Sequence, residues 1–324
     1  MFYEHDWSRV GDNGSVNAAQ SRHVAREPLA VRVALPLGVL FTAMASLATL
    51  CGVIAEAPVA PVELPAPAAA LSIPAVEVDA RLAANPCADD AVRAALDAGD
   101  DAGVIASFGG GVAFREAIVN GNAPCISLSD PNRSWVVVNK QRPLEPVGFA
   151  PASLADIGLS ATTRSNELRP EPKNALESMA AEASDAGAGT LGINNGYRSF
   201  GLQERTYGGH VRDKGQSGAD AVSARPGFSE HQSGLAFDLV ACDPRCGAIE
   251  SFGATPQGRW VAENGWRYGF IVRYEPGQTG TTGYAPEPWH IRYIGPELAR
   301  TYHDGGFHTL EEFFGLPPAP DYSH

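Results

Sequence analysis

The chain has 324 residues, of which 44% are hydrophobic and 19% are charged, a composition typical of a globular protein and not of a disordered one. Its 37 acidic and 24 basic side chains give a formal net charge of −13. A nucleic-acid-binding protein needs a basic surface, so the charge argues against nucleic acid as a partner. No protein partner is predicted.

The first notable segment is the apolar run at residues 33–55, which contains no charged side chain. About 20 such residues can cross a bilayer as a helix. The basic residues before it are Arg9, Arg22, Arg26 and Arg32. The positive-inside rule therefore predicts that residues 1–32 stay in the cytoplasm and that the rest of the chain is exported.

A cleaved signal peptide is the alternative for this segment, because residues 55–57 read Ala-Glu-Ala, which resembles a cleavage site. However, Pro58 would follow the cut, and the apolar run is long for a signal peptide. We therefore favour an uncleaved single-pass anchor in the cell membrane, with the rest of the chain outside the cytoplasm.

Four cysteines follow the apolar run, and an oxidising compartment would favour disulfides between them. The simplest arrangement pairs Cys87 with Cys125 and Cys242 with Cys246. A zinc cluster of these four residues is the alternative, and we disfavour it because no CxxC motif occurs.

The exported part divides into three segments. Residues 56–75 are rich in Pro and Ala and are typical of a semi-rigid linker. Residues 76–130 predict a small helical region of unassigned function, with helical spacing at 88–96 and 114–119 on either side of three consecutive glycines. Residues 131–324 form the predicted catalytic domain.

The pattern of elements in residues 131–324 predicts the α+β class, because helices and hairpin-like strands are segregated along the chain. Helices are predicted at 174–186, with Asn174 as the cap, and at 255–264 before Gly265. Strands are predicted at 134–144, 190–197, 234–240, 270–274 and 289–295.

Two short motifs carry candidate metal ligands. His231 and Asp238 lie seven residues apart in SEHQSGLAFDL, and His290 lies in EPWHIRY. In the strand that contains Asp238, the residues on either side of it are apolar, so its carboxylate points to the opposite face and needs a partner there. Two imidazoles and one carboxylate can hold a catalytic zinc ion and leave one position open. We therefore predict one Zn²⁺ held by these three residues.

Glu287 is the candidate general base, because it lies three residues before His290 between Pro286 and Pro288. Zinc lowers the pKa of a bound water from about 15.7 to about 7, and a nearby carboxylate can take the proton. The alternative is that each histidine is structural and that the Asp forms a simple ion pair. The joint occurrence of all four residues favours the zinc site.

These motifs resemble those of a known family. SEHQSGLAFD matches the SxHxxGxAxD signature, and EPWH the ExxH signature, of the zinc D,D-carboxypeptidases in the LAS metallopeptidase group. Together with VNKQRPL, YRSFGLQ and YGFIVRY, they make residues 134–300 similar to the VanY-like D-alanyl-D-alanine carboxypeptidases of vancomycin resistance. The resemblance implies the LAS (hedgehog/DD-peptidase) fold with a central antiparallel sheet, and removal of the C-terminal D-alanine from peptidoglycan stem peptides.

The resemblance also implies roles for three further residues. Arg198, in the YRS motif, would stabilise the oxyanion or the substrate carboxylate, and Gln203 and Ser229 would bind the terminal carboxylate of the substrate. The metal motif is shared by L,D-carboxypeptidases and wall-peptide endopeptidases, so these activities stay open. A noncatalytic wall-binding module is a further alternative, and the presence of Glu287 argues against it.

Overall fold

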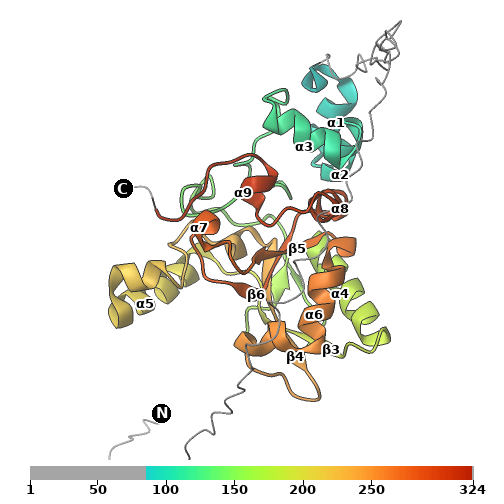
Figure 1. Cartoon of the computed structure of the whole chain (residues 1–324). Helices are drawn as coiled ribbons and strands as arrows, with labels where there is room; N and C mark the ends of the chain where they lie inside the picture. Colours follow the sequence, from blue (N-terminus) through green and yellow to red (C-terminus); the bar gives the residue numbers. More distant parts are fainter. Residues whose placement is uncertain (1–84, 323–324) are drawn as a thin grey trace, which may run out of the picture. The chain divides into compact units, whose positions relative to one another are not determined.

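The computed structural model describes residues 85–322 (Figure 1). The predicted cytoplasmic segment, membrane anchor and Pro/Ala-rich linker lie outside these residues, so they stay predictions. Within residues 85–322, no single helix has the length and apolar character to cross a membrane. Helices α2 (Asp101–Ser107) and α3 (Gly111–Val119) meet that criterion only as a pair, which is bent by 81°.

The described part of the predicted helical region, residues 85–130, contains three α-helices. Helix α1 (Asp90–Ala98) is capped by the side chain of Asp89, and α2 by the side chain of Asp100. The glycine break separates α2 from α3 as predicted, but α2 itself was not predicted, because its few apolar residues give no clear helical period. Apolar residues of α2 and α3 share a core cluster with residues beyond position 130, which include Trp135, Ile271, Leu298 and Leu310.

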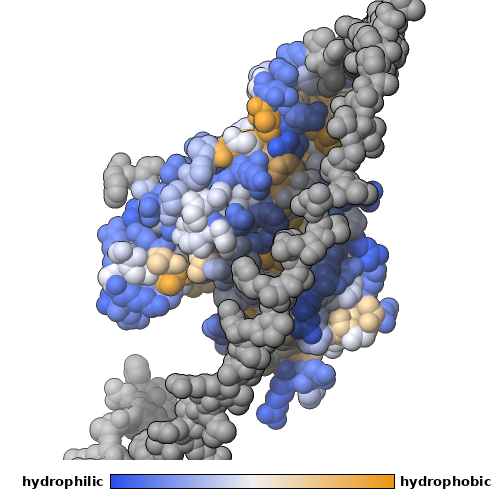
Figure 2. Space-filling view, in the orientation of Figure 1, coloured by the Kyte–Doolittle hydropathy of each residue, from blue (hydrophilic) through white to orange (hydrophobic). Residues whose placement is uncertain are grey.

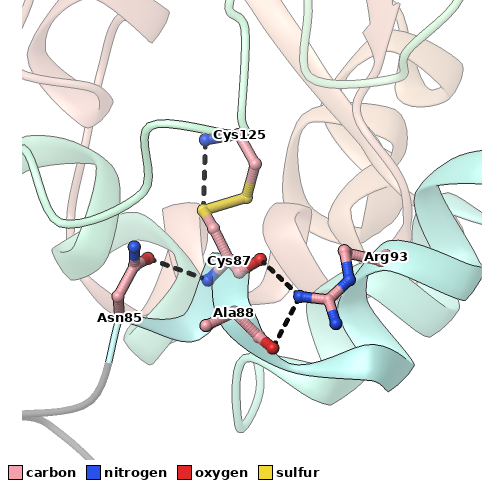
Figure 3. The surroundings of a disulfide bond; sticks show 5 residues. All are labelled: Asn85, Cys87, Ala88, Arg93 and Cys125. Carbon is pink, nitrogen blue, oxygen red and sulfur yellow. Dashed lines mark hydrogen bonds between the residues drawn. A yellow bond between two sulfur atoms is a disulfide. The ribbon is translucent and has the colours of Figure 1, made fainter.

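The predicted cysteine pairing is confirmed at both sites. Cys87, in the 3₁₀-helix η2 (Pro86–Ala88), is bonded to Cys125 beyond α3. Around this disulfide, Asn85 accepts a hydrogen bond from the Cys87 amide, and Arg93 donates to the Ala88 carbonyl at 2.6 Å (Figure 3). The second disulfide joins Cys242 to Cys246.

A four-stranded antiparallel sheet lies at the centre of residues 131–322, which confirms the α+β class. A separate two-stranded sheet pairs β1 (Ala155–Asp156) with β2 (Glu167–Leu168). In the central sheet the order is β3 (Thr190–Asn195), β4 (Ala236–Cys242), β6 (Glu287–Tyr293) and β5 (Phe270–Tyr274).

The strand predicted at 134–144 is wrong. This segment is buried and β-branched, but it forms only an isolated bridge between Asn139 and Arg142. The physical reason is that buried arginines take its carbonyl groups: Arg292 donates to the carbonyls of Ser134 and Val136. The segment therefore needs no neighbouring strand to satisfy its backbone.

The helix predicted at 174–186 starts earlier than expected. Helix α4 runs from Pro170 to Asp185, and Arg169 is its cap residue, so the prediction that Asn174 caps it is wrong. Proline is favoured in the first helical turn, which explains the early start. The prediction for α6 (Pro256–Asn264) is confirmed, and Thr255 caps it by accepting a hydrogen bond from the Gly258 amide.

The remaining helices lie in the segments that connect the strands of the central sheet or follow its last strand, β6. Helix α5 (Phe200–Asp220), which projects from the rest of the described chain in Figure 1, has only Gln203 and Ala219 buried, and it is kinked at Gly215. The other helices are α7 (Thr279–Thr282), α8 (Pro296–Asp304), α9 (Leu310–Phe313) and the 3₁₀-helices η3 (Glu230–Ser233), η4 (Ile249–Ala254) and η5 (Gly265–Tyr268).

The two faces of the sheet differ in chemistry. Helices α4 and α6 cover one face, where Phe237, Leu239 and Ile291 pack against Leu176 and Val261. Because successive side chains on a strand alternate between faces, the residues between these apolar ones point to the other side. Those residues include Asp238, His290 and Arg292, and all three are buried.

The visible outer surface of the described part is mostly hydrophilic, with hydrophobic residues in small areas (Figure 2). Scattered exposed apolar side chains of this kind are normal for a folded protein. The larger ones are Val112, Val119, Val147, Leu202 and Val222.

The disulfides should differ in their contribution to stability. Replacing Cys87 and Cys125 by Ser should lower the free energy of unfolding by about 2–4 kcal/mol, because this bond closes a sequence separation of 38 residues. The matched replacement of Cys242 and Cys246, which are four residues apart, should have a smaller effect. Urea unfolding of both variants measures this, and a larger loss from the second pair would contradict it.

Candidate metal centre

The register of the sheet brings three polar residues into one row. Asn195 on β3 lies opposite Asp238 on β4, and Asp238 lies opposite His290 on β6. His231 reaches the same place from η3, the turn that precedes β4. Gly234 ends this turn with a φ of 71°, a conformation that glycine adopts readily. The local structure therefore places both motifs at one point on the sheet.

His231, Asp238 and His290 form a buried cluster whose ligand atoms lie within 4.8 Å of one another. Asp238 Oδ1 is 3.5 Å from His231 Nε2 and 3.3 Å from His290 Nδ1. The two imidazole rings meet edge to face, with 4.9 Å between their centroids. The structure thus brings together the three residues predicted as zinc ligands.

The other polar atom of each ligand is already engaged. His231 Nδ1 lies 2.8 Å from the Gly196 carbonyl oxygen, and His290 Nε2 lies 3.1 Å from Glu230 Oε2. Asn195 Nδ2 donates to Asp238 Oδ2 at 3.0 Å. When both rings are neutral, these contacts favour the N–H at His231 Nδ1 and at His290 Nε2, and the other nitrogen of each ring then presents a lone pair to the cluster.

Asp238 Oδ1 is the clearest sign that the cluster suits a cation. This oxygen is buried and has no hydrogen-bond partner among residues 85–322. A buried carboxylate oxygen without a partner is costly, and a bound cation removes that cost. Two nitrogen lone pairs and one carboxylate oxygen fit the donor set of zinc.

The charged groups within the cluster shift the pKa values of Asp238 and His290. Burial raises the pKa of Asp238, but His231 and His290 outweigh it and hold that pKa well below its usual range. Burial lowers the pKa of His290, but the adjacent carboxylates of Asp238 and Glu230 raise it to about 9. The metal-free site therefore holds a proton that a metal ion would displace.

Glu287 and Arg198 lie beside the cluster. Glu287 Oε2 is 3.8 Å from His290 Nδ1, and its side chain keeps 25% exposure. Burial raises the pKa of Glu287 to about 7, helped by the negative charge of Asp238. The Arg198 amide donates to the His231 carbonyl oxygen, and burial lowers its side-chain pKa against the opposing charges of Asp238 and Glu287.

Ser229 and Gln203, the other two residues predicted to bind substrate, are both buried, and their surroundings differ. Ser229 is buried two residues before His231. Gln203 is also buried, and its Nε2 donates to Ser223 Oγ and to the Ala224 carbonyl, so it connects α5 to the following loop. Its Oε1 has no partner within the described part of the chain. A carboxylate requires a donor, so substrate binding by Gln203 would require its amide to be turned. Both roles stay predictions.

Sequence reasoning missed a buried ionic cluster next to the site. Glu230 Oε1 lies 3.0 Å from Arg273 Nε and 2.8 Å from Arg292 Nη1, and Arg273 also pairs with Glu311 at 2.7 Å. All four side chains have 0% exposure. The sequence did contain a signal for this cluster, because Arg273 and Arg292 each lie in a strand of mostly apolar residues. A charged side chain buried in a sheet requires a buried partner.

This cluster keeps its carboxylates ionised. Burial raises the pKa of Glu230, but Arg292, Arg273 and His290 outweigh it, so its pKa lies well below the usual range. Burial likewise raises the pKa of Glu311, and Arg273 and Asn139 lower it below 4.5. Two glutamates and two arginines balance one another in charge, which makes their burial tolerable.

Two cavities lie away from the metal cluster. One, of about 800 Å³, lies between the glycine turn before α3 and helix α8, and the other, of about 400 Å³, is lined by residues that include Trp266, Val272 and Tyr302. His303 and His308 line the second cavity, where His303 stacks on Trp266 and His308 pairs with Glu275. The metal site is therefore identified by its donor set and not by a cavity.

A buried His-Asp-His set beside a carboxylate whose pKa lies near 7 is the arrangement of a mononuclear metallohydrolase. Comparison with known proteins identifies the family. A family model described as VanY, D-alanyl-D-alanine carboxypeptidase, matches residues 165–296, which contain all four residues. The chain belongs to the VanY family of carboxypeptidases.

Individual relatives agree with this assignment. YodJ of Bacillus subtilis strain 168, whose name assigns it provisionally to the carboxypeptidases, is 35% identical over 58% of this chain and 69% of its own length. A D-alanyl-D-alanine carboxypeptidase of Enterococcus faecium is 36% identical over 42% of this chain and 40% of its own length. The structure of LdcB, an LD-carboxypeptidase, shows 35% identity and a TM-score of 0.54, and the match covers 58% of this chain and 88% of LdcB.

Zinc binding should depend on the three predicted ligands. The metal-free chain should bind one Zn²⁺, and Asp238→Asn should weaken binding on the order of 100-fold, because it removes the charge of the only carboxylate ligand. Competition with a chromophoric chelator measures the affinity. His303→Gln serves as the control, because His303 stacks on Trp266 outside the cluster, and it should bind zinc like the wild type. Equal affinities of the wild type and Asp238→Asn would contradict the ligand set.

The buried ionic cluster should make stability depend on pH. Glu311→Gln should lower the free energy of unfolding near neutral pH by about 3 kcal/mol, because it removes one charge of a buried pair. The folded-state pKa of Glu311 lies below 4.5, so its contribution is complete above that value and is lost as the pH falls through the folded-state pKa. The stability difference should therefore shrink in acid. Urea unfolding at neutral and acidic pH tests this, with the exposed neighbour Glu312→Gln as control.

Proposed function

We propose that this protein is a zinc-dependent D-alanyl-D-alanine carboxypeptidase that removes the C-terminal D-alanine from peptidoglycan stem peptides. The observation that carries the proposal is that one potential ligand atom each of His231, Asp238 and His290 converge next to Glu287. The name of the Enterococcus faecium relative supports the substrate.

Zinc is the proposed metal, with one ion held by the three residues. Imidazole and carboxylate ligands suit zinc, and three protein ligands leave a position for water or a substrate oxygen. When bound, the ion polarises the scissile carbonyl and lowers the pKa of water.

Glu287 is the proposed general base and acid. A carboxylate with a pKa of about 7 can accept a proton from the attacking water and then pass it to the leaving amine. Burial produces this pKa, and the 25% exposure of the side chain leaves the carboxylate accessible from solvent. Its position three residues before His290 keeps it beside the reacting bond.

Arg198 is proposed to stabilise negative charge on the substrate. Its guanidinium lies within electrostatic range of Asp238 and Glu287, and its buried Nε has no hydrogen-bond partner among the described residues. A free donor on a fixed cation can bind either the oxyanion or the terminal carboxylate. The backbone hydrogen bond to His231 holds it at the site.

An L,D-carboxypeptidase is the second candidate, because the similar structure of LdcB is that of an LD-carboxypeptidase. Both activities release one C-terminal residue and use the same proposed chemistry. They differ in the stereochemistry of the residue before the scissile bond, which contacts beyond the metal ligands must distinguish.

We also propose that the enzyme acts outside the cytoplasm, anchored by residues 33–55. Two disulfides support an oxidising compartment. The proposed substrate lies in the cell wall, and the Pro/Ala-rich residues 56–75 would separate the catalytic domain from the membrane.

The activity should be tested with the full-length chain, zinc and a muramyl pentapeptide, and with the matching tetrapeptide in parallel. Mass spectrometry should show loss of one alanine from the pentapeptide. Glu287→Ala should lower kcat by about 10³-fold, because it removes the general base, and it should leave zinc binding intact. Glu263→Ala, an exposed glutamate on α6, should match the wild type.

The product pattern separates the candidate functions. Cleavage of the tetrapeptide alone would support the L,D activity in place of the D,D activity. Cleavage at an internal bond would indicate an endopeptidase. Zinc binding without cleavage of either peptide would contradict the proposed enzyme and favour a wall-binding module.

A further inference from the structure

We propose that Glu230 is a positioning residue of the metal centre, which fixes the ring of His290 so that Nδ1 faces the metal. This inference rests on the proposed function only in taking His290 as a ligand. The signature SxHxxGxAxD leaves the residue at position 230 unspecified, and Glu230 makes no direct contribution to the ligand set.

The two oxygens of Glu230 have separate partners. Oε2 lies 3.1 Å from His290 Nε2, and Oε1 lies 3.0 Å from Arg273 Nε and 2.8 Å from Arg292 Nη1. His290 Nδ1 is thereby left on the side of Asp238, 3.3 Å from Oδ1. A flipped ring would lose the bond to Glu230 and turn carbon toward Asp238. The carboxylate thus selects both the tautomer and the orientation of the ring.

Glu230 is itself held in place by a rigid frame. Arg292 also donates to the carbonyls of Ser134 and Val136, and Arg273 also donates to both oxygens of Glu311. Each arginine therefore has a fixed position that is independent of Glu230. With no solvent contact, the carboxylate has no alternative partner.

Glu230 also links the positions of the two histidines, His231 and His290. It lies next to His231 in the same 3₁₀-helix, and the hydroxyl of Ser233 donates to its backbone carbonyl at 2.6 Å. The backbone of η3 places one ligand, while the side chain of its first residue orients another. An ionised carboxylate on the far nitrogen also makes the imidazole a better electron donor to a cation.

The test compares Glu230→Gln with Glu311→Gln in the full-length chain. Both variants remove one negative charge from the same buried cluster, but only Glu230 contacts a ligand. Zinc affinity, measured by chelator competition, should fall by about 10- to 100-fold for Glu230→Gln. It should be unchanged for Glu311→Gln, although that variant is less stable. Equal losses in both variants, or no loss in Glu230→Gln, would overturn the proposal.

A second variant keeps the test valid if Glu230→Gln does not fold. Glu230→Gln combined with Arg292→Gln restores the charge balance of the cluster, because it leaves Glu311 paired with Arg273. Circular dichroism confirms folding before zinc is added. The double variant should show the same 10- to 100-fold loss of affinity, and wild-type affinity would overturn the proposal.

The readout is independent of peptidase activity. A wild-type chain that binds zinc but cuts no wall peptide would refute the proposed function, and the comparison of Glu230→Gln with Glu311→Gln would still decide the role of Glu230. Loss of zinc binding only in the Glu230 variants supports the positioning role in either case.

Discussion

The structure of the site depends on the antiparallel pairing of β4 with β6. This pairing sets Asp238 directly opposite His290, and the neighbouring strand β3 adds Asn195 to the same row. Because side chains alternate along a strand, a shift of one residue would move Asp238 or His290 into the apolar core beneath α4 and α6. Packing of Phe237 and Ile291 on those helices therefore also fixes the position of the metal ligands.

The other face of the sheet has a polar interior. Charged side chains are buried there in two connected groups, the metal cluster and the ionic cluster of Glu230, Arg273, Arg292 and Glu311. Their connection is the contact between Glu230 and His290. Asp238 Oδ1 faces the two histidines and has no hydrogen-bond partner among residues 85–322. A buried carboxylate oxygen in this setting favours a bound cation.

The chemistry of the site and its specificity have different origins. The candidate ligands, Glu287 and Arg198 come from short motifs, and they are the residues on which the proposed hydrolytic chemistry depends. The choice between D,D and L,D substrates depends on the shape of the surrounding surface. The relatives reflect this division, because the family model names a D-alanyl-D-alanine carboxypeptidase while the similar LdcB structure is an LD-carboxypeptidase.

The sequence by itself determined the class of the fold and the short motifs that carry the candidate metal ligands, because short motifs and alternating strands are local features. It indicated the cysteine pairing only as the simplest arrangement, which the structure confirmed. Tertiary structure alone decided the rest. The segment at 134–144 has the composition of a strand but gives its carbonyls to Arg292, and Glu230 finds His290 60 residues away. Such contacts join residues that are distant in sequence, and the partner of a buried charge is set by which chain segments pack together.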